Sequence, residues 1–223
     1  MSIDPYYSRS EVSNSDLTSL FYRLFPQMDF VKGKDKQQAF RLGTLVDAFV
    51  TEPGKIDFIH RTIDEEIYEK EEFNWAKKML SALKKRARKD KFLQYVLEHA
   101  ETQKQFVNPS QPFQCGCFKF NLPTRCKFDW WLGHFGGDLK TTAAETQSQF
   151  ESQIDFVSWD RSRVFYMLLT ESLNPLYGQQ DFIYAISKKN QKVFFKKILK
   201  GDEIYTRGLE KLQNLAFTAW TLM

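Results

Sequence analysis

Residues 125–142 read Arg-Cys-Lys-Phe-Asp-Trp-Trp-Leu-Gly-His-Phe-Gly-Gly-Asp-Leu-Lys-Thr-Thr and carry the strongest fold signal in the chain. An apolar and aromatic run over 126–132 precedes glycines that predict a turn at 133–137, and a second extended segment follows at 138–140. This order predicts a β-hairpin. Because side chains alternate faces along a strand, we expect Asp138 and Lys140 to point to one side and Leu139 to point into the core.

The predicted hairpin brings together residues that can do metal-dependent chemistry. If 126–132 is the first strand, Asp129 can face the same side as Asp138 and Lys140. Two carboxylates can hold a hard divalent cation through oxygen. A nearby lysine can orient or deprotonate a water molecule, or balance negative charge that builds up on a phosphate.

The pattern of Asp129, a turn and then Asp-Leu-Lys at 138–140 resembles the PD-(D/E)xK nuclease motif. The continuation Thr-Thr at 141–142 makes it similar to the RecE-type (exonuclease VIII) and lambda-exonuclease-like phage recombination nucleases. Phe128 stands where that motif has its proline, which is not a metal ligand.

A second stretch, residues 37–52, predicts a strongly apolar helix that contains one carboxylate, Asp47. A buried carboxylate is costly unless it is paired or bound to a cation. The spacing Gly-Thr-x-x-Asp-x-x-x-x-Glu-Pro is similar to Gly-Thr-x-x-His-x-x-x-x-Glu-Pro of RecE-like nucleases, with Asp47 at the position of the metal-supporting histidine. The alternative is an ion pair between Asp47 and Arg41 or another cation.

The resemblance implies an α/β fold of the restriction-endonuclease type, with a mixed central β-sheet flanked by helices. It implies a Mg²⁺-dependent deoxyribonuclease, in which Mn²⁺ can substitute, acting as a 5′–3′ exonuclease on double-stranded DNA ends. The metal ligands would be Asp47, Asp129, Asp138 and the backbone carbonyl of Leu139, while Lys140 would position the attacking water. An endonuclease of restriction or repair type and a non-catalytic DNA-end-binding protein are the alternatives.

The same resemblance implies partners beyond DNA. Phage-type recombination implies a single-strand-annealing recombinase, and the family's rings imply a homo-oligomer, a trimer or a tetramer. In these families the helix after the hairpin carries a Gln-x-x-x-Tyr element beside the active site. Tyr166 matches the tyrosine and Ser162 takes the glutamine position. Arg161 and Arg163 could hold DNA phosphate in compensation, or form surface ion pairs with acidic neighbours.

Composition sets the wider limits. A chain of 223 residues with 42% hydrophobic residues and 21 phenylalanines can form one well-filled domain. The net charge of +4 is compatible with a nucleic-acid partner without requiring one. The sequence contains neither an apolar run of the ~18–20 residues that span a bilayer nor a signal peptide, so we expect a cytoplasmic protein without membrane association. Cys115, Cys117 and Cys126 are expected to be buried free thiols.

The remaining elements follow from periodicity and turn residues. We expect one nuclease domain over 1–223, with a helical part over about 8–106, a sheet core over about 107–200 and a C-terminal helix over about 202–222. Within it, the predicted elements are a helix capped by Ser13 or Ser15, a helical and charged region over 56–106, a strand pair that turns at 121–123, a long helical region over 143–173 and a hairpin over 182–198. The basic run at 83–91 fits a solvated helix face or a track for phosphates.

Overall fold

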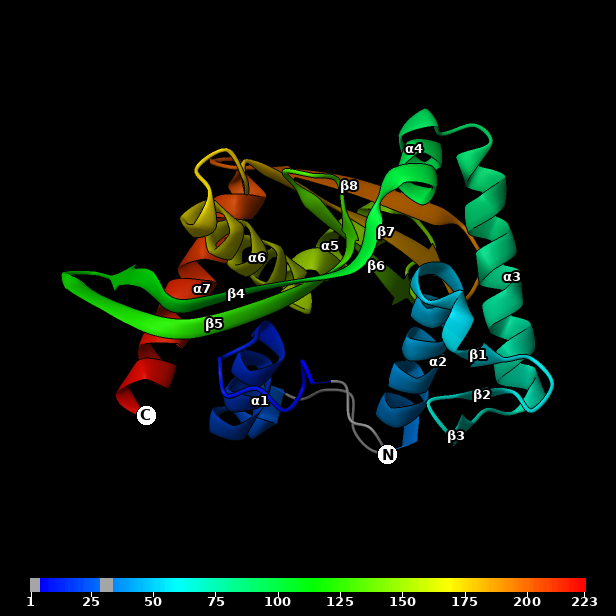
Figure 1. Cartoon of the computed structure of the whole chain (residues 1–223), viewed down its shortest axis with the longest axis horizontal. Coiled ribbons are helices and arrows are strands. Elements are labelled where there is room, and N and C mark those ends of the chain that lie inside the picture. The colour runs from blue at the N-terminus through cyan, green and yellow to red at the C-terminus, as the bar shows by residue number, and fades with distance from the viewer. Residues whose placement is uncertain (1–4, 29–33) are drawn as a thin grey trace.

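The protein is built around one five-stranded mixed sheet (Figure 1). The computed structural model describes residues 5–28 and 34–223. The strands lie side by side in the order β4-β5-β6-β7-β8; β6 and β7 are parallel and the other neighbours are antiparallel. Their bounds are β4 (Glu101–Cys115), β5 (Phe118–Trp131), β6 (Gly136–Thr142), β7 (Gln180–Ser187) and β8 (Val193–Leu199). The predicted fold class, a mixed sheet flanked by helices, is confirmed.

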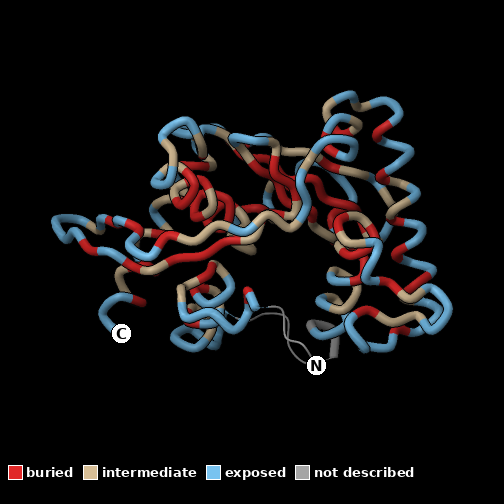
Figure 2. The backbone as a smooth tube through the Cα atoms, viewed as in Figure 1, coloured by how far each residue is buried: buried red, intermediate tan, exposed pale blue. Residues whose placement is uncertain are grey.

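Helices cover both faces of this sheet and create two apolar cores. One core joins the sheet to α1 (Asn14–Leu24), α5 (Gln147–Phe156), α6 (Trp159–Leu173) and α7 (Glu203–Thr221). The other joins it to α2 (Lys34–Thr51), α3 (Lys70–Ala87) and α4 (Lys91–His99). The buried backbone in Figure 2 follows the central strands and the inner helices. In the described part of the chain, no helix is long and apolar enough to cross a membrane.

The expectation of a helical region over 56–106 is wrong in part. Residues 56–67 form a small antiparallel sheet of β1 (Ile56–Asp57), β2 (Thr62–Ile63) and β3 (Glu66–Ile67), and residues 101–106 already belong to β4. Arg61, Asp64 and Glu65 adopt positive φ, which ends a helix and makes tight turns. The high charge of the segment concealed these turns. Short 3₁₀ turns, η1 (Pro26–Met28) and η2 (Pro53–Lys55), flank α2.

The turn predicted at 121–123 also lies elsewhere. The β4–β5 hairpin turns at Gly116 (φ +58) and Cys117, whereas 121–123 lies inside β5. Pro123 is tolerated there because it faces the bulge in β4 between Asn108 and Gln111, where no ladder bond needs its missing N–H.

The expected helical region over 143–173 is divided into α5 and α6. Ser158 lies at the junction and adopts a left-handed conformation (φ +57), which interrupts the right-handed helix there. Other expectations are confirmed: Ser13 caps α1 in a capping box with Asp16, the β7–β8 hairpin forms, and Asp202 caps α7 by accepting the N–H of Tyr205.

Candidate active site

The predicted site lies where β5 and β6 separate. These strands pair only at Trp130↔Gly137 and Trp131↔Gly136. The next residue on each strand is an aspartate, and we call this pair, Asp129 and Asp138, the β5–β6 fork. Oδ2 of Asp129 accepts the backbone N–H of Leu139 at 2.7 Å, so a side chain takes the place of the next strand–strand contact.

Two glycines make room beside the fork for rings from both neighbouring strands, Phe128 on β5 and Phe182 on β7. A Cβ atom on Gly136 would lie 2.0 Å from the ring of Phe128, and one on Gly137 would lie 2.1 Å from the ring of Phe182. Both rings are buried, so neither can move away cheaply. The predicted turn at 133–137 is therefore shorter, because Gly136 and Gly137 are already strand residues.

Asp138 is held as a carboxylate by two cations. Nζ of Lys140 lies 2.6 Å from its Oδ2, and Nη1 of Arg163 lies 3.1 Å from its Oδ1. Burial alone would raise the pKa of Asp138, but Lys140 and Arg163 outweigh it and lower this pKa to about 2. Leu139 points into the core, as predicted. The Lys140 side chain keeps 30% of its surface exposed, whereas that of Arg163 is fully buried.

Asp129 carries the opposite perturbation. Burial, together with the nearby charges of Asp47 and Asp138, raises its pKa well above the ordinary value. The pKa values of the two fork carboxyls are thus shifted in opposite directions. A divalent cation between the two carboxylates would relieve the repulsion between them.

Asp47 reaches the same place from α2. Burial raises its pKa to about 6, although the charge of Lys140 opposes this, and the nearby charge of Asp138 adds to the rise. Its carboxylate lies 3.2 Å from the Thr51 hydroxyl and accepts a hydrogen bond from Gln103 at 3.3 Å. Arg41, one of the alternative partners considered for Asp47, pairs instead with Glu66 and Glu72.

Gln103 was missed by the sequence reasoning. It lies near the start of β4, and its side-chain amide also donates to the Thr51 hydroxyl at 3.0 Å. A glutamine in a long polar strand has no distinctive local pattern, so only the three-dimensional contact reveals its place beside Asp47.

The residues at the fork could bind a divalent cation through two carboxylates, but they do not form a complete set of protein ligands. Within residues 5–28 and 34–223, no group of three or more histidine, cysteine, aspartate or glutamate side chains is arranged to hold a metal ion. The expected site of Asp47, Asp129, Asp138 and the Leu139 carbonyl is therefore not preassembled. Mg²⁺ commonly takes only one or two carboxylates and completes its octahedron with water and substrate phosphate, and the β5–β6 fork offers such a pair.

The arginines predicted to contact DNA are inside the protein. Arg161 is 4% exposed, and its guanidinium donates to Asn14 and Thr18 of α1. Arg163 is fully buried and bridges Asp138 to Asp181, with Nε 3.1 Å from the Asp181 carboxylate. Neither guanidinium is accessible to a DNA phosphate, so the predicted DNA contact is wrong. The alternative of surface ion pairs is wrong as well, because both arginines are buried and stabilise the fold.

The other two residues of that element also face the interior. Ser162 is 8% exposed. Tyr166 is half-buried, with its ring 4.9 Å from that of Phe128 and 4.1 Å from the Arg163 guanidinium carbon. Tyr166 thus packs against the inner side of Arg163 rather than lining an open surface.

The expectation for the cysteines is only partly correct. All three are free thiols, but only Cys126 is buried, while Cys115 is half-buried and Cys117 is exposed at the tip of the β4–β5 hairpin. The basic run is exposed toward the end of α3, and its contact with phosphate stays a prediction.

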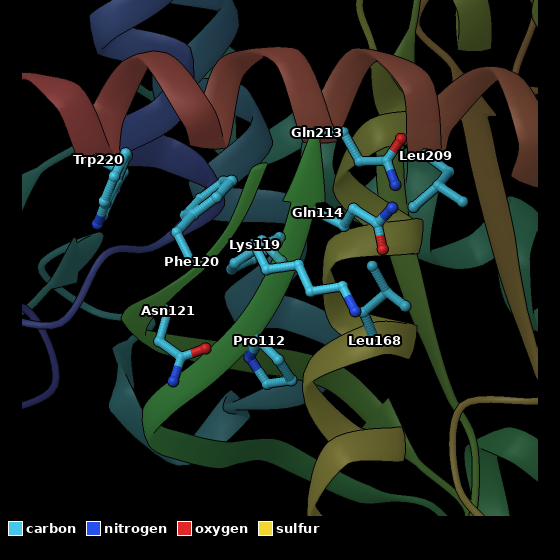
Figure 3. A pocket seen from close by; sticks show the side chains of 10 residues that line it. Pro112, Gln114, Lys119, Phe120, Asn121, Leu168, Leu209, Gln213 and Trp220 are labelled. Atoms are coloured by element: carbon cyan, nitrogen blue, oxygen red, sulfur yellow. The ribbon is translucent and has the colours of Figure 1, made fainter. Parts of the chain in front are cut away.

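A hollow of about 680 Å³ lies away from the fork, between the outer half of the β4–β5 hairpin, α6 and α7 (Figure 3). Phe120, Leu168, Leu209 and Trp220 give it an apolar lining, with Lys119 and Gln213 at its side. A second hollow of about 660 Å³ lies along α5 and the segment after β6. Neither is lined by the fork aspartates.

Comparison with known proteins supports the fold. No protein-family model and no curated protein sequence matches the chain. Among solved structures, the chain is similar to a "Putative exonuclease" from Eubacterium rectale, with a TM-score of 0.54 and 12% identity over 90% of this chain and 71% of that one. A weaker likeness, to SSO0001, has a TM-score of 0.34 and 12% identity over 56% of this chain and 50% of that one. At such identity the first likeness shows a shared fold.

Proposed function

We propose that the protein is a metal-dependent deoxyribonuclease whose active centre is the β5–β6 fork with Lys140. The observation that carries this proposal is the placement of Asp129 and Asp138 side by side where β5 and β6 separate, with the Lys140 amine 2.6 Å from Asp138. The fold it shares with the Eubacterium rectale protein, which carries the name of an exonuclease, agrees with this chemistry.

Each residue of the proposed site has a role that follows from its surroundings. Asp129 and Asp138 would hold Mg²⁺ or Mn²⁺, with the Leu139 carbonyl as a further oxygen and Asp47 orienting the shell. Such a cation, when bound, lowers the pKa of water and stabilises charge on a phosphate. Lys140, charged and partly exposed, holds the attacking water or the phosphate oxygen. Arg163 keeps Asp138 ionised from the buried side.

The substrate proposal is linear double-stranded DNA, digested in the 5′ to 3′ direction during phage-type recombination. This rests on the Asp-Leu-Lys-Thr-Thr run at 138–142 and the Gly-Thr-x-x-Asp spacing around Asp47, which resemble RecE-like nucleases. A homo-oligomeric ring and a single-strand-annealing recombinase as partner belong to the same proposal.

The test is digestion of end-labelled linear duplex in Mg²⁺ by wild type, Asp138→Asn and Lys140→Met, with circular dichroism to verify folding. Both variants should lose at least about 100-fold in rate. Lys119→Met removes an exposed lysine at the hairpin and should retain full activity. A wild type without Mg²⁺-dependent digestion, or variants as active as Lys119→Met, would overturn the proposal. Moving the label between the 5′ and 3′ ends reports polarity.

An endonuclease is the second candidate because it could use the same fork. Covalently closed circular DNA separates the two, since an exonuclease leaves it intact. Duplex binding that survives EDTA, with no cleavage in any divalent metal, would instead indicate a DNA-end-binding protein.

A further inference from the structure

Gln103 has a strained backbone inside a regular strand. Six described residues other than glycine have positive φ, and the other five lie in turns or loops. Gln103, with φ +54, is within β4, where Thr102↔Trp130 and Lys104↔Phe128 pair on either side of it. An L-residue in this left-handed conformation costs about 1–2 kcal/mol relative to the usual one.

The strained position places Gln103 opposite the fork. The pairs on either side put it across from Asp129 on β5. Its side chain extends to α2, where the amide donates to Oδ2 of Asp47 at 3.3 Å and to Oγ1 of Thr51 at 3.0 Å. One residue thus connects the strand beside Asp129 to the helix that carries Asp47.

Both oxygens of the Asp47 carboxylate have a hydrogen-bond partner. Thr51 lies 3.2 Å from Oδ1, and Gln103 donates to Oδ2. An amide gives hydrogen bonds to a carboxylate without adding or removing charge. Gln103 therefore fixes the direction of Asp47 while leaving its negative charge available to a cation.

We propose that Gln103 is a positioning residue of the metal site, held in a strained backbone so that its amide orients Asp47 toward the β5–β6 fork. This inference rests on the proposed function insofar as the fork holds a divalent cation. Local strain of this kind persists where surrounding structure imposes it, and it is often found at functional sites. Outer hydrogen-bond partners of metal ligands typically account for about 10- to 100-fold in metal affinity.

The test compares two glutamines that both have positive φ. Gln191, with φ +56, lies in the loop between β7 and β8 and serves as the matched control. Mn²⁺ affinity is measured by electron paramagnetic resonance titration, and thermal unfolding is followed in EDTA. Gln191→Gly should raise the unfolding midpoint by about 2–4 °C and leave Mn²⁺ affinity unchanged.

Gln103→Gly should weaken Mn²⁺ binding by about 10-fold or more without lowering the unfolding midpoint by more than a few degrees. Gln103→Met, which keeps the side-chain length but lacks the amide, should weaken it equally. Wild-type affinity in both Gln103 variants would overturn the inference, even if the protein cleaves DNA. The two proposals can also fail separately. If the wild type binds Mn²⁺ but cleaves no DNA, and the Gln103 variants lose Mn²⁺ affinity, the inference about Gln103 is supported and only the proposed nuclease function is overturned.

Discussion

The amine of Lys140 lies 2.6 Å from Oδ2 of Asp138, on the side of this carboxylate away from the core, while Arg163 holds its other oxygen from the buried side. One carboxylate thus has one partly exposed and one fully buried cation. In the proposed function, Lys140 meets the metal or the phosphate, whereas Arg163 holds the carboxylate in place. This difference in burial divides the site into a reacting part and a supporting part.

Because Arg163 is buried between two carboxylates, we expect its removal to lower the free energy of unfolding strongly. Arg163→Met should destabilise the protein by about 3–5 kcal/mol in urea unfolding at pH 7, because it leaves the buried Asp181 without its cation and Asp138 with Lys140 alone. Arg86→Met removes an arginine with 46% side-chain exposure and should cost at most about 1 kcal/mol. Equal losses in the two variants would show that Arg163 does not compensate these charges.

The elevated pKa of Asp47 predicts a pH-dependent effect of Asp47→Asn. Because this acid has a pKa of about 6 in the fold and about 3.9 in the unfolded chain, its stabilising contribution is complete below about pH 4 and is lost as pH rises through 6. Asparagine does not ionise, so the variant does not lose stability in this way. In EDTA, the free energy of unfolding of Asp47→Asn should therefore rise by about 2 kcal/mol relative to that of wild type between pH 4 and 7. Urea unfolding at several pH values checks this, and a constant difference would contradict it.

The two glycines beside the fork predict steric intolerance. Gly136→Ala and Gly137→Ala should each cost at least about 1–3 kcal/mol, because the new methyl groups would meet the rings of Phe128 and Phe182. Gly54→Ala meets no atom within 4 Å and should be neutral or slightly stabilising. Denaturant unfolding measures all three. A tolerated alanine at 136 would mean that the ring of Phe128 on β5 does not pack against β6 as described, and one at 137 would mean the same for the ring of Phe182 on β7.

Thiol reactivity provides a check on the hairpin and its core. Cys117 is exposed and should react rapidly with a disulfide reagent such as DTNB, with Cys115 slower. Burial raises the pKa of the Cys126 thiol, which should react only on unfolding. Stopped-flow absorbance of wild type and Cys117→Ser separates the phases. Rapid reaction of Cys126 in the native protein would contradict the described core.

The fork was predictable because its signals are local. Alternation around Leu139 and the glycines that precede it place Asp138 and Lys140 on one side without any knowledge of the rest of the fold. The hairpin β7–β8 and the caps Ser13 and Asp202 were predictable for the same reason.

The remainder of the site depends on contacts between distant segments. Arg163 looked like a surface cation because arginine usually is one, and only the pairing with Asp181 on β7 shows its burial. Gln103 depends on a backbone angle that its residue type does not encode. The small sheet at 56–67 was concealed because its turns use charged residues in left-handed conformations rather than glycine.

The most direct test of the central claim is the position of Mn²⁺ in a crystal of the wild-type protein, located by anomalous scattering. The account predicts a peak between the carboxylates of Asp129 and Asp138, absent from a crystal of Asp138→Asn prepared in the same way. Mn²⁺ bound elsewhere, with no peak between these two carboxylates, would contradict it.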